Sequence, residues 1–79
     1  MPRFFFNLIE DAVIADDEGR DLPGVEAAHS EAVKSARDIA CAELAEGQLH
    51  LNHRIEVTDA FGELLDTVRL GDVVEVLDD

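Results

Sequence analysis

A long alanine-rich segment, Gly24–Gly47, limits what this chain can fold into more than any other feature. Its apolar residues recur at spacings of three and four, which place them on one face of an α-helix. The residue before Pro23 is disfavoured in helical conformation, and Gly47 can adopt a positive φ, so both ends of the helix are marked. Alanine side chains fill little volume, so we expect this helix to lie close against a flat apolar sheet.

Two β-type segments precede the helix. Arg3–Glu10 has aromatic and branched residues on both faces, which predicts a central strand with Asn7 as its one polar interruption. Ala12–Ala15 is a candidate second strand. Asp16–Gly19 then predicts a polar turn in which the glycine adopts a positive φ.

Two further strands are predicted after the helix. His53–Asp59 and Glu63–Leu70 flank Asp59–Gly62, which has the aspartate-first, glycine-last preference of a type I turn. Val73–Leu77 is a candidate short final strand. The residues that we expect to face inward are Ile55, Val57, Leu64 or Leu65, Val68 and Leu70.

The expected fold is α+β, with a small, largely antiparallel sheet and one long helix packed on one face. The element order is β-β-α-β-β, with the candidate fifth strand at the end. Residues 1–79 form a single domain, whose last few residues we expect to fray. A core of this size supplies only about 3–5 kcal/mol, so self-association is a plausible source of further burial.

Charge is the strongest compositional signal. The chain has 19 acidic and 6 basic residues and a formal net charge of −13. Such a charge repels phosphate backbones and anionic lipid headgroups, so we expect neither nucleic acid nor a membrane as a partner. The single cysteine, Cys41, cannot form an intramolecular disulfide, and no segment has the features of a signal peptide or a bilayer span. These features favour a cytoplasmic protein.

The arrangement of several short motifs resembles a known family. The first half of the chain contains the opening MPRFFF, the Asp17-Glu18-Gly19 turn, Asp21-Leu22-Pro23 and the helix start Glu26-Ala27-Ala28. The second half contains Ile55-Glu56-Val57, followed by Asp59, Gly62 and Thr67-Val68. This combination resembles the domain-of-unknown-function family DUF 6894. The resemblance implies a bacterial origin and supports the fold, but it implies no activity. Members of that family often have a histidine at the position of Asn7.

The three histidines and the cysteine are the candidate metal ligands of this chain. His50 and His53 are three residues apart, Cys41 lies on the predicted helix, and His29 is further away. A zinc site needs about four convergent ligands, and residues at this spacing do not converge in an extended segment as they do on a helix. We therefore expect surface histidines and no metal site.

The remaining candidate sites favour structural explanations. Cys41 lies far from the helix N-terminus, which would lower a thiol pKa, so we expect a small half-buried packing residue and no nucleophile. Asp16, Asp17, Glu18 and Asp21 cluster at a turn without the spacing of a calcium loop. No nucleotide-binding or hydrolase motif is present. We expect no catalytic residue, no cofactor and no enzyme activity.

Two functions remain from different classes. The first is a non-enzymatic interaction module, self-associating or bound to another protein through a sheet edge. The second is an acidic regulator that captures a basic protein by mimicking nucleic acid, for which the carboxylates should cluster on one face.

Overall fold

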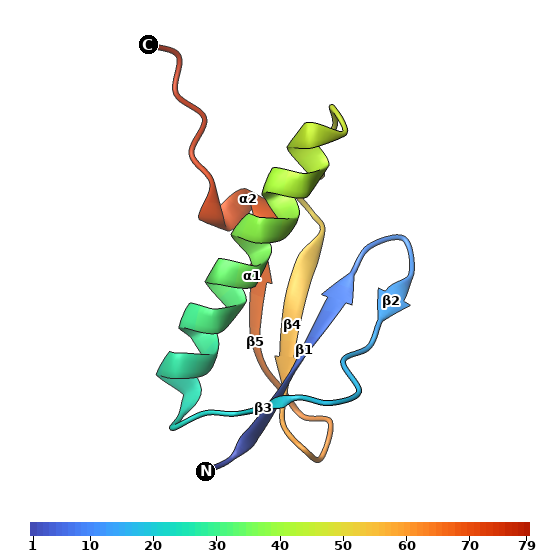
Figure 1. Ribbon diagram of the computed structural model, residues 1–79, viewed down its shortest axis with the longest axis vertical. Helices are drawn as coiled ribbons and strands as arrows, with labels where there is room; N and C mark the ends of the chain where they lie inside the picture. The colour runs from blue at the N-terminus through green and yellow to red at the C-terminus, as the bar shows by residue number, and fades with distance from the viewer.

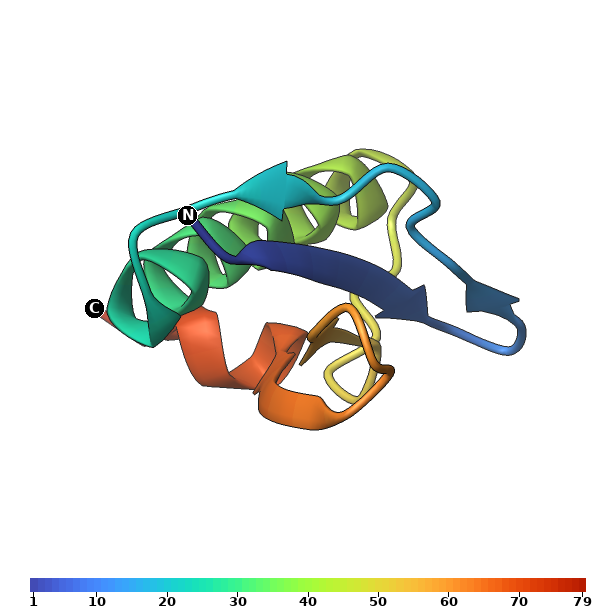
Figure 2. The same cartoon turned by 90° about the horizontal axis from the view of Figure 1, so that it is seen from below.

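A computed structural model describes the whole chain, residues 1–79. The sheet has the strand order β2-β1-β4-β5, with β3 also paired to β1, and all pairs are antiparallel. Helix α1 lies along one face of this sheet (Figures 1 and 2). The α+β fold predicted from the sequence is confirmed. The elements in chain order are β1 Arg3–Ile9, β2 Val13–Ile14, β3 Arg20–Asp21, α1 Val25–Ala45, β4 Arg54–Thr58, β5 Leu64–Arg69 and α2 Leu70–Val73.

The core forms between α1 and the central strands. Four alanines spaced four residues apart form the buried face of α1, so the helix backbone lies close to the sheet. Their partners are larger apolar residues of the strands and of α2. The nine buried residues are Phe4, Ala28, Ala32, Ala36, Ala40, Ile55, Val57, Val68 and Leu70. The predicted pairing of an alanine face with an apolar sheet is confirmed.

Glycines occupy the turn positions that the sequence marked. Gly47 follows α1 with φ of 89° and donates to the carbonyl of Leu44 at 2.9 Å. Gly62 closes the β4–β5 hairpin with φ of 82° and donates to the Asp59 carbonyl at 3.1 Å. Both residues adopt the conformation that lacks a steric penalty only for glycine.

The predicted inward position at Leu64 or Leu65 is wrong. In the regular register Asp66 lies opposite Val57, and an irregularity between Val57 and Thr58 then places Leu64 opposite Thr58. Both leucines are exposed. Asp66 takes the position facing the helix, where its carboxylate contacts His29 at 2.6 Å.

The candidate strand at Val73–Leu77 does not form. Leu70–Val73 is the short helix α2, and the residues after it have no regular structure and extend away from the body (Figure 1). Leu70 is fully buried, and the Asp72 carboxylate accepts a hydrogen bond from the Arg69 N–H at 3.4 Å. Anchoring of Leu70 in the core together with this capping contact turns the chain into a helix instead of continuing the sheet.

Candidate functional site

One candidate surface lies at the β2 edge of the sheet. The two residues of β2, Val13 and Ile14, are 67% and 53% exposed, although both are large and apolar. β2 pairs only with the end of β1, through Leu8 with Ile14 and Ile9 with Val13. Its other edge has no strand partner. β2, which we call the arm, therefore presents both apolar side chains and an open strand edge.

A partly apolar groove lies beside β2, between β1 and α1. It has a volume of about 400 Å³. Phe6 and Leu8 of β1, Ile39 of α1 and Ile14 of the arm contribute apolar side chains to it. We call this the β1 groove. It exists because α1 packs mainly over β4 and β5, which leaves the β1 side of the sheet incompletely covered.

The segment after β2 forms one wall of the β1 groove, and Asp16 holds this segment against β1. Its carboxylate accepts hydrogen bonds from the backbone N–H groups of Phe6, Glu18 and Gly19, each at 3.1 Å. Burial raises the pKa of the Asp16 carboxyl, but these three bonds and the nearby Arg20 charge outweigh burial, so the pKa lies below its ordinary value of 3.8.

Gly19 allows this wall to approach β1 closely. It has φ of 71°, and a Cβ placed there would lie 2.8 Å from the Phe4 carbonyl oxygen. A larger residue would therefore displace the wall from the strand. The predicted positive φ at Gly19 is confirmed.

Asn7 is partly buried and takes part in a hydrogen-bond network. Its side-chain amide donates to the Glu56 carbonyl at 3.3 Å and to Thr58 Oγ1 at 3.2 Å, and its oxygen accepts from the Asp16 N–H at 3.0 Å. Both polar ends of the side chain are satisfied. Asn7 thus connects β4, β1 and the groove wall.

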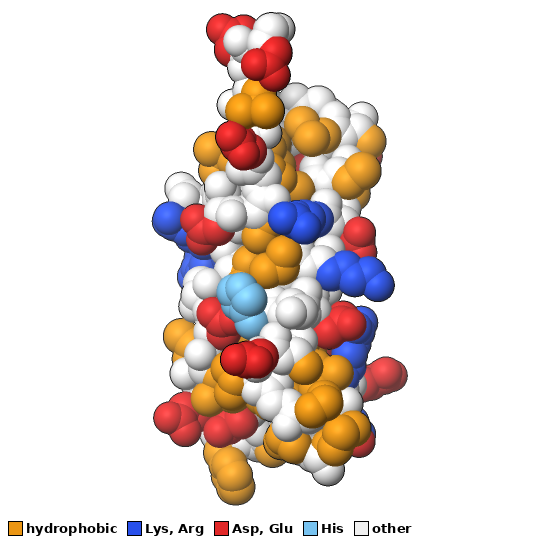
Figure 3. Space-filling model, turned by 90° about the vertical axis from the view of Figure 1, so that its left-hand side faces the viewer, with side chains coloured by type: hydrophobic (Ala, Val, Ile, Leu, Met, Phe, Trp, Pro, Cys, Tyr) orange, Lys and Arg blue, Asp and Glu red, His pale blue; other side chains and the backbone are white.

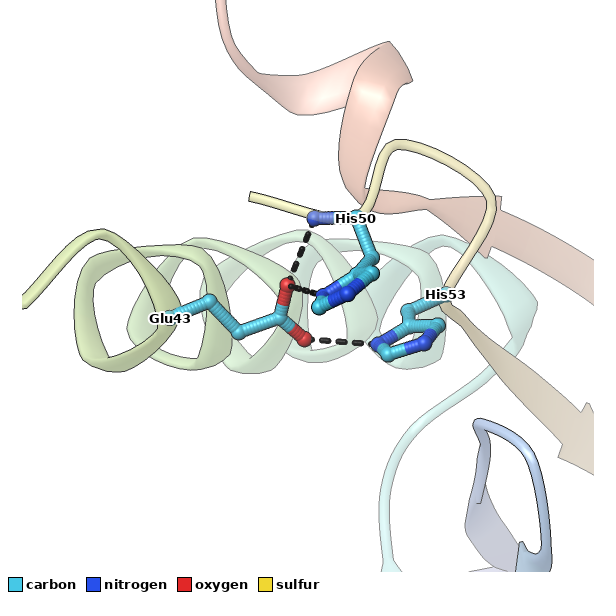
Figure 4. Close-up of side chains that lie close together, drawn as sticks. All are labelled: Glu43, His50 and His53. Carbon is cyan, nitrogen blue, oxygen red and sulfur yellow. Dashed lines mark hydrogen bonds and ion pairs between the residues drawn. The ribbon is translucent and has the colours of Figure 1, made fainter. Parts of the chain in front are cut away.

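A second candidate site lies where the loop between α1 and β4 folds back onto the last turns of α1. Glu43, His50 and His53 place one potential ligand atom each within 4.8 Å of one another, and we call them the Glu43 cluster. One carboxylate oxygen of Glu43 lies 3.0 Å from His50 Nδ1, and the other lies 2.7 Å from His53 Nδ1. Figure 4 shows the carboxylate facing both imidazole rings, which stack with centroids 4.3 Å apart.

The loop backbone brings the two histidines together. The N–H of His53 donates to the carbonyl of His50 at 3.2 Å, so the four residues 50–53 form a turn. The N–H of Leu70 donates to the His53 carbonyl at 2.8 Å, and that of Gly71 to the Leu51 carbonyl at 3.0 Å, which fix the turn against α2. The expectation that this spacing would not converge is therefore wrong, because it assumed an extended segment.

Glu43 is held as a carboxylate in this cluster. It also accepts a hydrogen bond from the backbone N–H of His50 at 2.7 Å. Burial raises the pKa of Glu43, but the His50 N–H and the two imidazoles outweigh it, so the pKa lies below its ordinary value of 4.5. No local sequence motif marks Glu43, which lies seven residues before His50 in the last turns of the helix that the turn folds back onto.

The other candidate ligands lie elsewhere. His29 pairs with Asp66 of β5. Cys41 is exposed, so the expectation of a half-buried packing residue is wrong. It lies two residues before Glu43, a separation that places side chains on different faces of a helix.

The four acidic turn residues make separate contacts. Asp16 binds backbone N–H groups, and Asp21 pairs with Arg3 at 3.0 Å, while Asp17 and Glu18 are exposed. Only Asp16 directs its carboxylate inward. Of these residues, Asp16 stabilises the turn before β3.

The fold defines a small two-layer α+β domain with an open sheet edge, and neither helix is long and apolar enough to cross a membrane. The chain belongs to the family described as domain of unknown function DUF6894, whose model matches residues 3–71. No curated protein and no solved structure matches the chain. The resemblance of the opening, turn and hairpin motifs to this family is confirmed.

Proposed function

We propose that this protein is a non-enzymatic interaction module that self-associates through the β2 edge of its sheet. The observation that supports this most is the exposure of Val13 and Ile14 on an unpaired edge beside the β1 groove. Only nine of the 79 residues are buried, so a second copy would supply burial that one chain lacks.

The opposite edge of the sheet is less suited to strand addition. On β5, the N–H of Thr67 donates to the Asp66 carboxylate at 2.8 Å, and the N–H of Arg69 donates to Asp72. Backbone donors that already bind carboxylates are not free for a new strand, and charged side chains at an edge oppose pairing. The β2 edge therefore remains the better candidate.

Pairing of β2 with the β2 of a second copy would continue the sheet across a two-fold axis. Both α1 helices would then lie on the same face, and the two β1 grooves would join between them. A stable interface buries about 800 Å² per partner. That is about a seventh of the 5428 Å² exposed by one chain, so the interface must include the groove as well as the arm.

The alternative function, capture of a basic protein by nucleic-acid mimicry, has weaker support. Figure 3 shows acidic side chains interspersed with basic and hydrophobic ones on one face. Four arginines pair with carboxylates in the ion pairs Arg3–Asp21, Arg20–Glu31, Arg54–Glu56 and Arg69–Asp72. Mimicry of a phosphate backbone calls for carboxylates without such interruption.

Sedimentation equilibrium tests the proposal with two matched variants. Ile14 and Leu64 are each 53% exposed but lie on opposite edges of the sheet. We expect the wild type to be a dimer at about 100 µM, Ile14→Lys to be monomeric, and Leu64→Lys to remain dimeric. Screening of the negative charge at about 0.5 M salt should strengthen the dimer.

Two outcomes would contradict the proposal. A wild-type chain that stays monomeric at about 100 µM excludes a dimer of useful affinity. Dissociation by Leu64→Lys, with Ile14→Lys still dimeric, assigns the interface to β5 instead. Circular dichroism of both variants should match the wild type, because both substitutions are at exposed positions.

A further inference from the structure

We infer that the Glu43 cluster is a binding site for Zn²⁺ or a similar first-row divalent cation. The site combines one carboxylate and two imidazoles, which come from α1 and from the turn before β4. Nitrogen and oxygen donors of this kind are the ligands that Zn²⁺ takes in proteins. This inference is independent of the proposed self-association.

The three potential ligand atoms already lie within 4.8 Å of one another. Zn–N and Zn–O bonds near 2.0–2.2 Å in a tetrahedron place neighbouring donor atoms about 3.3 Å apart. The Glu43 oxygens lie 3.0 Å and 2.7 Å from the Nδ1 atoms of His50 and His53. These contacts involve different oxygens of the carboxylate, so binding of one ion would lengthen each contact by about 0.3–0.6 Å and bring the two Nδ1 atoms toward a common centre. His50 is exposed, so its ring has room to tilt toward the ion.

A fourth ligand position is also available. Glu10, at the end of β1, has a carboxylate oxygen 3.8 Å from His53 Nδ1. Either this carboxylate or a water molecule can complete a four-coordinate site. An ion held by these groups would connect three segments that are distant in sequence, namely the end of β1, the last turns of α1 and the turn at residues 50–53.

The charges around the Glu43 cluster favour the binding of a cation, because its carboxylates have only histidine partners. Neither Glu10 nor Glu43 has an arginine or lysine among its ion-pair partners, and both approach His53. Elsewhere in the chain, acidic residues such as Glu31 and Asp72 have arginine partners. A divalent ion would neutralise the two carboxylates in a protein of net charge −13.

Calorimetric titration with ZnCl₂, in a Cys41→Ser background that removes the thiol, tests this inference. We expect one ion per chain with micromolar or tighter affinity and a higher melting temperature with zinc. His50→Gln and His53→Gln should each weaken binding by about 100-fold. His50 is exposed, so loss of binding in His50→Gln is separable from loss of folding.

His29→Gln is the matched control, because His29 also contacts a carboxylate, Asp66, at 2.6 Å but has no second imidazole beside it. It should bind zinc within about twofold of the parent. MgCl₂ at equal concentration should not raise the melting temperature, because imidazole nitrogen is a poor ligand for Mg²⁺. Co²⁺ should give the intense visible absorption of a four-coordinate site, and this band should be lost in His53→Gln.

Three results would overturn the inference. The first is no saturable zinc binding below about 1 mM. The second is an equal loss of affinity in His29→Gln and His53→Gln. The third is equal stabilisation by Mg²⁺ and Zn²⁺, which would show a general response to the acidic surface. In each case the cluster would serve only as a set of hydrogen bonds that joins α1 to the following turn.

Discussion

Asp16 and Asn7 replace backbone pairing where the sheet is interrupted. β2 pairs with the last residues of β1 and β3 with its first, which leaves the N–H of Phe6 between them without a strand partner. The Asp16 carboxylate accepts that hydrogen bond, and the Asn7 side chain accepts one from the Asp16 N–H. Two polar side chains thereby hold the connection between β2 and β3 against the central strand.

Loss of the Asp16 carboxylate should therefore destabilise the fold in a pH-dependent way. Asp16→Ala leaves three backbone N–H groups without their acceptor, which we expect to lower the free energy of unfolding at pH 7 by about 1–3 kcal/mol. Because the folded-state pKa of Asp16 is lowered, its contribution is fully present above the unfolded value near 3.8 and is lost as pH falls through the folded value. Urea unfolding at pH 7 and at several values below 4 measures both effects.

Asp17→Ala is the control, since Asp17 is exposed and its carboxylate makes no hydrogen bond within the chain. It should change stability by less than about 0.5 kcal/mol. The difference between wild type and Asp16→Ala should shrink on acidification. A difference that is constant from pH 7 to pH 2.5 would show that the charged carboxylate is not what stabilises the turn.

At the scale of elements, α1 determines how close the two layers lie. Ala36 is fully buried in the middle of its sheet-facing side. Ala36→Leu adds three carbons where the backbone of the helix approaches the sheet, and we expect it to destabilise the fold by about 1–3 kcal/mol through overpacking. Chemical unfolding by urea measures the change.

Ala42→Leu serves as the matched substitution on the exposed side of the same helix. Leucine and alanine have similar helix propensities, so this variant should stay within about 0.5 kcal/mol of the wild type. Equal effects at positions 36 and 42 would mean that the alanine face is not closely packed against the sheet.

The regular elements were predictable because periodicity reports which face of a segment is buried. The alanine spacing of α1 and the alternation at Ile55 and Val57 were both sufficient. β3 was not predictable, because Arg20 and Asp21 lack strand propensity and pair through contacts with β1, including the Arg3–Asp21 ion pair. α2 and the register shift in β5 likewise depend on tertiary packing.

The candidate site was only partly predictable for a similar reason. The sequence shows that His50 and His53 are near each other, but not that a turn brings their rings together. A turn-forming asparagine, Asn52, was the available signal for that turn. The participation of Glu43 depends on the chain folding back onto the end of α1, which no local pattern reports.

At the scale of the whole molecule, a small core is combined with a large negative charge. Nine buried residues hold together a chain of net charge −13, and several large apolar residues remain exposed. Two groups among these exposed residues differ in how they are held. Val13 and Ile14 lie on an ordered strand edge, whereas Val76 and Leu77 lie in the extended C-terminal segment. Of these two groups, only Val13 and Ile14 are held in a fixed position by a strand.

This difference predicts the effect of removing the C-terminal segment. Truncation after Val74 keeps the partly buried Val73 and Val74 and the hydrogen bond from Arg37 Nε to the Val73 carbonyl, which is 3.0 Å long. It removes residues 75–79, which are all exposed and include three of the 19 acidic residues. We expect stability to stay within about 0.5 kcal/mol of the full chain, as for other exposed positions.

The same truncation separates the two ways in which this chain could associate. If the β2 edge forms the interface, the truncated protein should dimerise as well as the full chain, or slightly better because less negative charge is brought together. Sedimentation equilibrium of both chains at equal concentration and salt measures this. A truncated chain that becomes monomeric while remaining folded would show that residues 75–79 add a strand between copies, and the exposed arm at Val13 and Ile14 would then need another explanation.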